Sequence, residues 1–291
     1  MKKGKKYWLN YWIFIGPVFL SFTMFYLVPV VLGLGYSLYD WNGISNSKTF
    51  LGLQNYKKLL TDENYWVSLK FTFKYALFSI IFTNIFALLM ALWANGKLKS
   101  SIFARICFFL PNVLCAVITG MLWKFIFNQA GPSLAKLTGL SFLGTKLLAS
   151  PNTAWLAVVI VALWTGCGYN MIIYIAGLVS IDQTYYESAA IDGATKIQSF
   201  FKITLPLMMP SITITLFNTT SGALKMFDLN LTLTGGGPGR STTGMALDVY
   251  QTAFSQNRMG YGQAKAVILL IIVIFVVFVQ LQFTRKKEVE M

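Results

Sequence analysis

The sequence predicts an all-α polytopic membrane protein with six transmembrane helices. Of its 291 residues, 56% are hydrophobic and only 12% are charged, and the mean hydropathy is +0.60. A helix needs about 20 apolar residues to cross the hydrocarbon core of a bilayer, and runs of that length recur along the chain. The predicted spans are residues 11–36, 71–93, 102–127, 154–178, 207–231 and 264–283.

The first apolar run is expected to be a retained span. Lysines followed by an apolar stretch resemble a signal peptide, but this stretch exceeds the usual core of about 7–15 residues and shows no small-x-small cleavage site. The segment 41–70 that follows reads as external and partly amphipathic, since Asp62 and Glu63 accompany its lysines.

The fifth span is the weakest by hydropathy because it is rich in polar residues. It carries Thr213, Thr215, Asn218, Thr219, Thr220 and Ser221, and ends with Lys225 and Asp228 one turn apart. Small polar residues can join closely packed membrane helices, or they can line a hydrophilic pathway. The density of the run and the expected ion pair at its end favour the pathway.

Basic residues beside the spans predict the orientation. An even number of crossings puts both termini on one side, together with three basic groups and the loop around Glu187. That side is expected to be the cytoplasm. The three groups are Lys2, Lys3, Lys5 and Lys6; Lys97, Lys99 and Arg105; and Arg285, Lys286 and Lys287.

The composition argues against several other classes of protein. The net charge of +14 is spread over loops, which indicates contact with anionic membrane lipid and no nucleic-acid partner. There is no histidine, and Cys107, Cys115 and Cys167 lie in predicted spans, so neither a metal site nor a disulfide framework is expected, and no cofactor. No Pro-, Ser- or charge-rich linker divides the chain, so residues 1–291 are expected to form one domain.

The most informative stretch is YESAAIDGATKIQSFFKITLPLMMP, residues 186–210, between the fourth and fifth spans. Its apolar residues recur at helical spacing, and Gly193 permits a bend. A helix lying on the bilayer surface would also explain such a pattern. The apolar positions are Tyr186, Ala189, Ala190, Ala194, Ile197, Phe200 and Phe201.

This stretch resembles the cytoplasmic EAA loop of binding-protein-dependent ATP-binding cassette (ABC) permeases. The matching residues are Glu187, Ala189, Asp192, Gly193, Ala194, Phe200, Ile203, Leu205, Pro206 and Pro210. Two positions depart from the pattern, with Ser188 in place of an alanine and Asp182 where the sugar-transporting branch commonly has proline. The resemblance implies that residues of about 181–206 form an ATPase-coupling loop, in which Glu187, Ala189, Asp192, Gly193 and Ala194 dock on a separate ATPase.

The chain has no nucleotide-binding motif of its own. The segment GGGPGRST, residues 235–242, resembles a P-loop, but Thr234 stands where its first glycine is needed and Arg240 where its lysine is needed. We expect an external turn there, and ATP hydrolysis in partner subunits.

Further segments are similar to the sugar-transporting branch of these permeases, which includes the larger maltose permease subunit. They are FLGLQNYKKLLTDENYW, FFLPNVLCAVITGMLW, LTLTGGGP and RMGYGQAKA. The resemblance implies the ABC importer permease fold in a bacterial cell membrane. It also implies a second permease subunit, two ABC ATPase subunits and an extracytoplasmic solute-binding protein as partners. The implied activity is alternating-access import of a sugar, a di- or oligosaccharide, without covalent chemistry in this chain.

The same resemblance implies a substrate pathway on the fourth and fifth spans. Its positions correspond to Ala162, Thr165, Gly166 and Tyr169, and to Thr219, Gly222, Ala223 and Met226. Other interpretations remain open: a permease for a glycerol-phosphate-type polyol, a membrane-embedded enzyme, which would need convergent acid, base or metal groups, and a helical receptor or scaffold.

Overall fold

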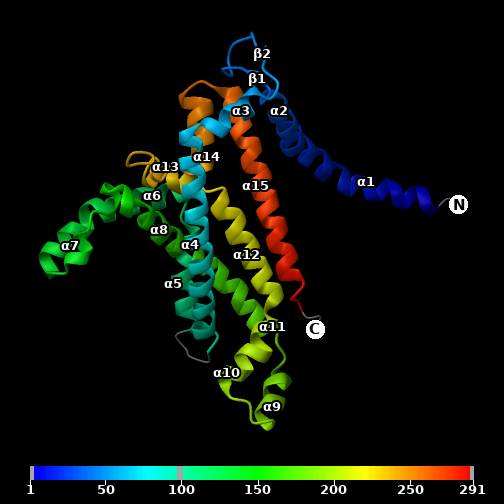
Figure 1. Ribbon diagram of the computed structural model, residues 1–291. Coiled ribbons are helices and arrows are strands. Elements are labelled where there is room, and N and C mark those ends of the chain that lie inside the picture. The colour runs from blue at the N-terminus through cyan, green and yellow to red at the C-terminus, as the bar shows by residue number, and fades with distance from the viewer. Residues whose placement is uncertain (1–2, 97–100, 289–291) are drawn as a thin grey trace. The chain divides into compact units, whose positions relative to one another are not determined.

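A computed structural model describes residues 3–96 and 101–288, and these are almost entirely helical (Figure 1). Contacts divide the chain into two compact units. The first comprises Met1–Asp62 with Val249–Leu270, and the second comprises Glu63–Asp248 with Ile271–Met291. Each unit combines stretches that are far apart in the sequence. A single domain over residues 1–291 stays a prediction.

The first unit contains the N-terminal span and a small antiparallel sheet. In the sheet Tyr39 pairs with Phe50 and Asp40 with Thr49. The elements are α1 (Lys3–Phe22), η1 (Thr23–Leu27), α2 (Val28–Tyr36), β1 (Tyr39–Asp40), β2 (Thr49–Phe50), α3 (Gln54–Thr61), η6 (Gln251–Ser255) and the beginning of α15 (Met259–Arg285).

The second unit contains the other helices. It includes α14 up to Asp248 and the part of α15 that begins at Ile271. Its elements are α4 (Glu63–Ala94), α5 (Ser101–Val113), α6 (Ala116–Phe125), η2 (Ile126–Ala130), α7 (Gly131–Thr138), η3 (Ser141–Gly144), η4 (Leu147–Ala149), α8 (Pro151–Val179), α9 (Gln183–Ile191), α10 (Lys196–Ser199), η5 (Phe200–Thr204), α11 (Leu205–Leu207), α12 (Met209–Leu224), α13 (Asp228–Leu233) and α14 (Met245–Tyr250).

Four helices of the described residues are long and apolar enough to cross a membrane, and two bent pairs raise the number to six if each pair is one span. The four are Trp12–Tyr36, Glu63–Ala94, Pro151–Val179 and Met259–Arg285. These helices match the first, second, fourth and sixth predicted spans, so the six-span prediction holds only with the two bent pairs counted as crossings.

The third predicted span, 102–127, is not one continuous helix. The structure breaks it after α5, and the next helical segment, Ala116–Thr138, leaves at 99°. Pro111 lies in the last turn of α5, where its ring removes a backbone donor and crowds the preceding turn. The helix therefore ends at Val113, and Cys115 adopts an extended ψ of 138° before α6 begins.

The fifth predicted span, 207–231, is also interrupted. A bend of 66° separates Lys196–Leu207 from Met209–Leu224, since Pro210 has no N–H to donate to the carbonyl of Pro206. At the other end the helix stops at Leu224, and residues 225–227 are not helical. The last predicted residues of the span belong instead to α13.

The core of the second unit lies where α4, α8 and α12 pack together. Alanines on α4 let the helices approach closely, and Gly168 on α8 fits so tightly against α5 that a Cβ there would overlap the carbonyl of Phe108. The buried cluster consists of Ala87, Ala91, Ala94, Met171, Tyr174, Ile175, Leu178, Ile181 and Met208.

Candidate functional site

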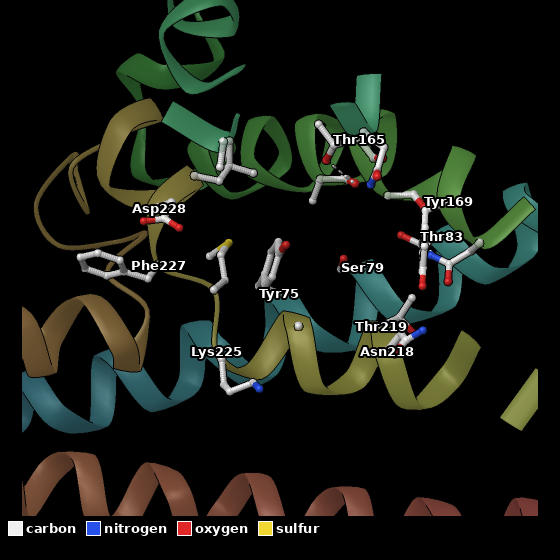
Figure 2. Close-up of a pocket in the computed structure, with 18 residues that line it drawn as sticks. Tyr75, Ser79, Thr83, Thr165, Tyr169, Asn218, Thr219, Lys225, Phe227 and Asp228 are labelled. Atoms are coloured by element: carbon white, nitrogen blue, oxygen red, sulfur yellow. Dashed lines mark hydrogen bonds between the residues drawn. The ribbon is translucent and has the colours of Figure 1, made fainter. Parts of the chain in front are cut away.

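A cavity of about 390 Å³ lies in the second unit, lined mainly by α4, α8, α12 and the segment after α12 (Figure 2). Small-molecule sites commonly measure about 300–1,000 Å³, so the cavity can hold a sugar-sized solute. The lining residues are Tyr75, Ser79, Thr83, Asn112, Ala116, Ala162, Thr165, Gly166, Tyr169, Asn170, Asn218, Thr219, Gly222, Lys225, Met226, Phe227, Asp228 and Leu229.

Most of the predicted pathway residues meet in this cavity. The fourth predicted span contributes Ala162, Thr165, Gly166 and Tyr169, and the fifth contributes Thr219, Gly222 and Met226. Ala223 is the exception, because it is only 6% exposed and is not part of the lining. Adjacent residues on a helix point about 100° apart, so when Gly222 faces the cavity, Ala223 faces the packed side of α12.

One lysine and one aspartate are the charged residues of the lining, Lys225 and Asp228. The sequence pattern placed them one helical turn apart as an ion pair, and this expectation is wrong. No helix runs through both residues, because α12 ends at Leu224 and α13 begins at Asp228, and their side chains point away from each other (Figure 2). The formal charge of the lining is nevertheless zero.

The wall that α4 contributes is a feature that the sequence reasoning missed. Tyr75, Ser79 and Thr83 line the cavity, each is less than 8% exposed, and the Tyr75 hydroxyl forms a hydrogen bond with Ser79. Their spacing of four residues puts them on one helix face. A polar stripe at this spacing inside an apolar span was the available signal.

Asn170 on α8 was also missed, and it presents a buried amide at the cavity. It is 4% exposed, and its Nδ2 donates to the carbonyl of Gly166 at 2.9 Å. Its Oδ1 finds no hydrogen-bond partner among the described residues. Buried polar atoms are normally satisfied, so this oxygen is available to a donor such as a hydroxyl.

The predicted coupling loop is a helix–turn–helix formed by α9 and α10. Gly193 has φ +75°, the left-handed conformation that ends α9, which confirms the expected bend. Asp182 caps the start of α9 by accepting the Thr184 N–H and hydroxyl, both at 2.9 Å, and these bonds lower the pKa of its carboxyl. Asp182, which stands where the family commonly has proline, therefore stabilises the start of α9.

The surface of this loop carries exposed apolar side chains. Ile191 is 87% exposed, Ile197 72% and Phe201 60%. Glu187, Asp192 and Gly193 are exposed, Ala194 is half-buried, and Ala189 is buried. Tyr186, one of the predicted apolar positions, is half-buried and its hydroxyl shares a 2.9 Å hydrogen bond with Thr204.

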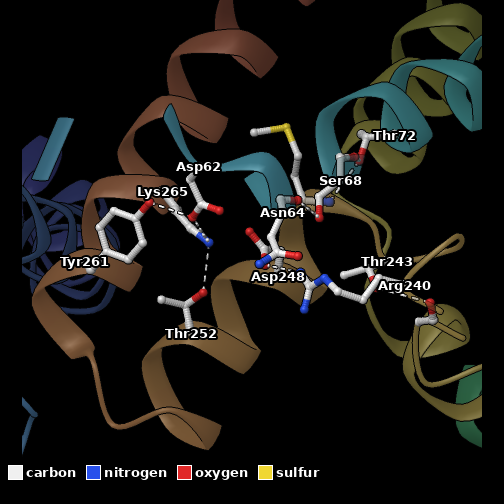
Figure 3. Close-up of polar contacts among 12 residues, drawn as sticks. Asp62, Asn64, Ser68, Thr72, Arg240, Thr243, Asp248, Thr252, Tyr261 and Lys265 are labelled. Carbon is white, nitrogen blue, oxygen red and sulfur yellow. Dashed lines mark hydrogen bonds and ion pairs between the residues drawn. The ribbon is translucent and has the colours of Figure 1, made fainter. Parts of the chain in front are cut away.

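Figure 3 shows two ionic groups, one in each unit, on residues whose pairing the sequence did not suggest. In the second unit Arg240, at φ +63°, pairs with Asp248 at 2.6 Å. In the first unit Lys265 lies 3.3 Å from Asp62 and donates to Thr252 at 3.0 Å, while the Tyr261 hydroxyl donates to Asp62 at 2.7 Å. The ion pair with Asp248 fixes Arg240 of the GGGPGRST turn, and the contacts with Asp62 fix Tyr261 and Lys265 at the start of α15.

Part of the predicted orientation signal lies outside the described residues. Lys2, Lys97 and Lys99, used for the orientation, fall outside the described residues. Among the residues that are described, no group of three or more His, Cys, Asp and Glu side chains could hold a metal ion.

Comparison with known proteins identifies the family. Residues 69–289 match the family described as binding-protein-dependent transport system inner membrane component. The chain is 40% identical, over the whole of both chains, to the probable starch degradation products transport system permease protein AmyD of Thermoanaerobacterium thermosulfurigenes. It is 37% identical to the multiple sugar-binding transport system permease protein MsmF of Streptococcus mutans, over 98% of this chain and 97% of that one.

A solved structure shares the fold. It is a chain of a bacterial ABC transporter involved in the import of the acidic polysaccharide alginate, with a TM-score of 0.83, 22% identity and 98% coverage of both chains. The family match covers most of the chain, and the relatives align from end to end. This protein therefore belongs to the binding-protein-dependent inner membrane components, the permease subunits of ABC importers.

Proposed function

We propose that this permease subunit imports a neutral di- or oligosaccharide across a bacterial cell membrane. The observation that carries the proposal is the cavity, whose lining offers hydroxyl and amide groups beside aromatic carbon and has no net formal charge. Such a lining can form hydrogen bonds with the hydroxyl groups of a sugar and can pack against the apolar faces of its rings. The names of its relatives, which refer to starch degradation products and to multiple sugars, support the same class of solute.

A glycerol-phosphate-type polyol is the alternative solute. A phosphate group is bound best by several basic side chains or backbone N–H groups. Lys225 is the one basic residue of the lining, and Asp228 opposes its charge. The cavity therefore favours the neutral solute. Its single carboxylate also provides no convergent acid–base pair of the kind that a membrane-embedded enzyme needs.

Transport requires coupling to ATP hydrolysis, and we assign that role to the α9–α10 loop. The proposed complex contains a second permease subunit, two ABC ATPase subunits and an extracytoplasmic solute-binding protein. Glu187 and Asp192 are exposed there beside Ile191 and Ile197, a combination of charge and apolar surface that suits protein docking. With this loop and both termini in the cytoplasm, alternating access follows from motion of the loop with the ATPases.

The proposal is tested by uptake competition in cells that carry the complete transporter. The labelled probe is maltotriose, which starch degradation yields, and the competitors are maltose, raffinose and glycerol 3-phosphate. We expect di- or trisaccharides to be taken up or to compete, and glycerol 3-phosphate to have no effect. Cells without this gene provide the control. No uptake of maltotriose above that control, together with uptake of labelled glycerol 3-phosphate, would favour the alternative solute.

A further inference from the structure

The two ends of the cavity differ in their chemistry. Phe227 and Asp228 lie at one end (Figure 2). The opposite end combines hydroxyl and amide groups, and the two charged residues of the lining are not part of it. We call it the amide end, and its residues are Thr83, Tyr169, Asn170, Asn218 and Thr219.

The amide group of Asn170 is oriented by its own helix, α8. Its Nδ2 donates to the carbonyl of Gly166 at 2.9 Å. Because a carbonyl oxygen can only accept a hydrogen bond, this contact turns the amide nitrogen toward Gly166 and the amide oxygen away from it. The oxygen, Oδ1, is buried and has no hydrogen-bond partner among the described residues. Asn170 therefore brings an unused acceptor to the amide end.

Nearby hydroxyl groups of the lining already form hydrogen bonds within the protein. Thr219 Oγ1 donates to the carbonyl of Thr215 at 2.8 Å and accepts from Asn84 Nδ2 at 3.0 Å. Thr165 Oγ1 donates to a carbonyl of its own helix at 3.1 Å. A buried polar atom in a folded protein normally has a partner. An acceptor left without one in the wall of a cavity points to a ligand that supplies the donor.

We propose that Asn170 determines solute specificity by accepting a hydrogen bond from a solute hydroxyl at the amide end. The inference rests on the proposed function, in which a polyhydroxylated solute occupies the cavity. A hydroxyl group can donate, whereas carboxylate, phosphate and ether oxygens only accept. A solute that places such an oxygen beside Oδ1 leaves two acceptors facing each other without a proton between them, which costs free energy. The amide end therefore selects a sugar unit with a free hydroxyl at this position.

The contact is tested by removing one hydroxyl of the solute at a time. The probe is labelled maltotriose, taken up by cells that carry the complete transporter, and the unlabelled competitors are maltotriose and its monodeoxy derivatives. The inhibition constant of each derivative, divided by that of maltotriose, measures the preference for the missing hydroxyl. The solute-binding protein is identical in all transporters compared, so a ratio that changes with residue 170 reports on the permease.

Two substitutions remove the acceptor. Asn170→Leu does so at similar volume, and Asn170→Ala with a smaller side chain. In each, the ratio for one derivative should fall by roughly fivefold, the shift expected for the net loss of one hydrogen bond, and the other ratios should not change. Asn230→Leu is the matched control. Asn230 is fully buried outside the lining, its Nδ2 donates to the carbonyl of Thr242, and its Oδ1 also has no partner among the described residues. This control should change no ratio.

The outcomes separate this contact from the proposed function. Ratios that stay unchanged in both Asn170 variants, or that change in Asn230→Leu as well, would overturn the contact even if sugars are transported. Uptake of labelled glycerol 3-phosphate and not of maltotriose by the unaltered transporter would remove the proposed solute. The same comparison is then made with the two deoxy forms of glycerol 3-phosphate, propane-1,2-diol 1-phosphate and propane-1,3-diol phosphate. A selective change of one ratio in the Asn170 variants would keep the contact, and no change would overturn it.

Discussion

Single side chains decide how the cavity distinguishes one solute from another. Tyr169 is 44% exposed and lines the cavity from α8. An aromatic ring can lie against the apolar face of a sugar while its hydroxyl forms a hydrogen bond. Tyr169 combines both kinds of contact in one residue.

Replacing Tyr169 by alanine should raise the KM for sugar uptake. Loss of the hydrogen bond alone costs about 0.5–1.5 kcal/mol, which is up to roughly tenfold in affinity. Tyr169→Phe should lose only that part, and Tyr169→Ala should lose more. Uptake is measured at matched abundance of the assembled complex. An unchanged KM and an unchanged sugar preference in Tyr169→Ala would remove this residue from the site.

The buried ion pair of the first unit makes a second prediction at the residue scale. The Lys265 side chain is 4% exposed and the Asp62 side chain 17%. Removing one partner of a buried pair leaves an uncompensated charge and typically costs about 3–5 kcal/mol. Lys265→Met should therefore lower the thermal stability of the purified complex strongly, and adding Asp62→Asn should restore part of the loss. Additive losses in the double variant would show that the two residues are not energetically coupled.

At the scale of elements, prolines and glycines determine where helices end and turn. Pro111 and Pro210 interrupt the third and fifth spans, and Gly193 ends α9 in the left-handed region. A Cβ at Gly193 would meet no atom within 4 Å. Substitutions at Gly193 should therefore act through backbone conformation and not through a steric clash within this chain.

This gives a matched pair of variants at Gly193. Asparagine tolerates the left-handed conformation, whereas β-branched residues do not. Gly193→Asn should keep transport coupled to ATP hydrolysis, while Gly193→Val should reduce transport by a factor of several with the protein still inserted. Uptake and ATPase activity are measured on the same purified complex. Equal activities for the two variants would mean that the turn does not contribute to coupling.

Over the whole molecule, the basic flanks and the even number of predicted spans predict that both termini and the α9–α10 loop lie in the cytoplasm. Ile44 is 84% exposed between β1 and β2, and Ile191 is 87% exposed at the end of α9. Ile44→Cys should react with an impermeant thiol reagent only from outside, and Ile191→Cys only from the cytoplasmic side. Reaction of both from the same side would overturn the predicted topology.

The sequence was sufficient to predict the helical membrane class, and comparison confirms the family. It was also sufficient to predict the bend at Gly193, because glycine beside aspartate is a local signal for a turn. The sequence did not predict the features that depend on tertiary packing. Hydropathy alone did not reveal the 99° break after α5 or the end of α12 at Leu224. The hydrogen bond of Tyr186 and the partners of Lys265 depend on distant segments, for which the local pattern carries no information.

The proposed function is an ATP-coupled pathway for a neutral sugar through this subunit. It is tested most directly in liposomes that contain the purified complex, with ATP on the ATPase side and labelled maltotriose and solute-binding protein on the other. We predict accumulation of the sugar that requires ATP and is abolished by Asp192→Lys, which reverses a charge on the coupling loop. Accumulation of glycerol 3-phosphate in place of any neutral sugar, or sugar accumulation unaffected by Asp192→Lys, would contradict the account.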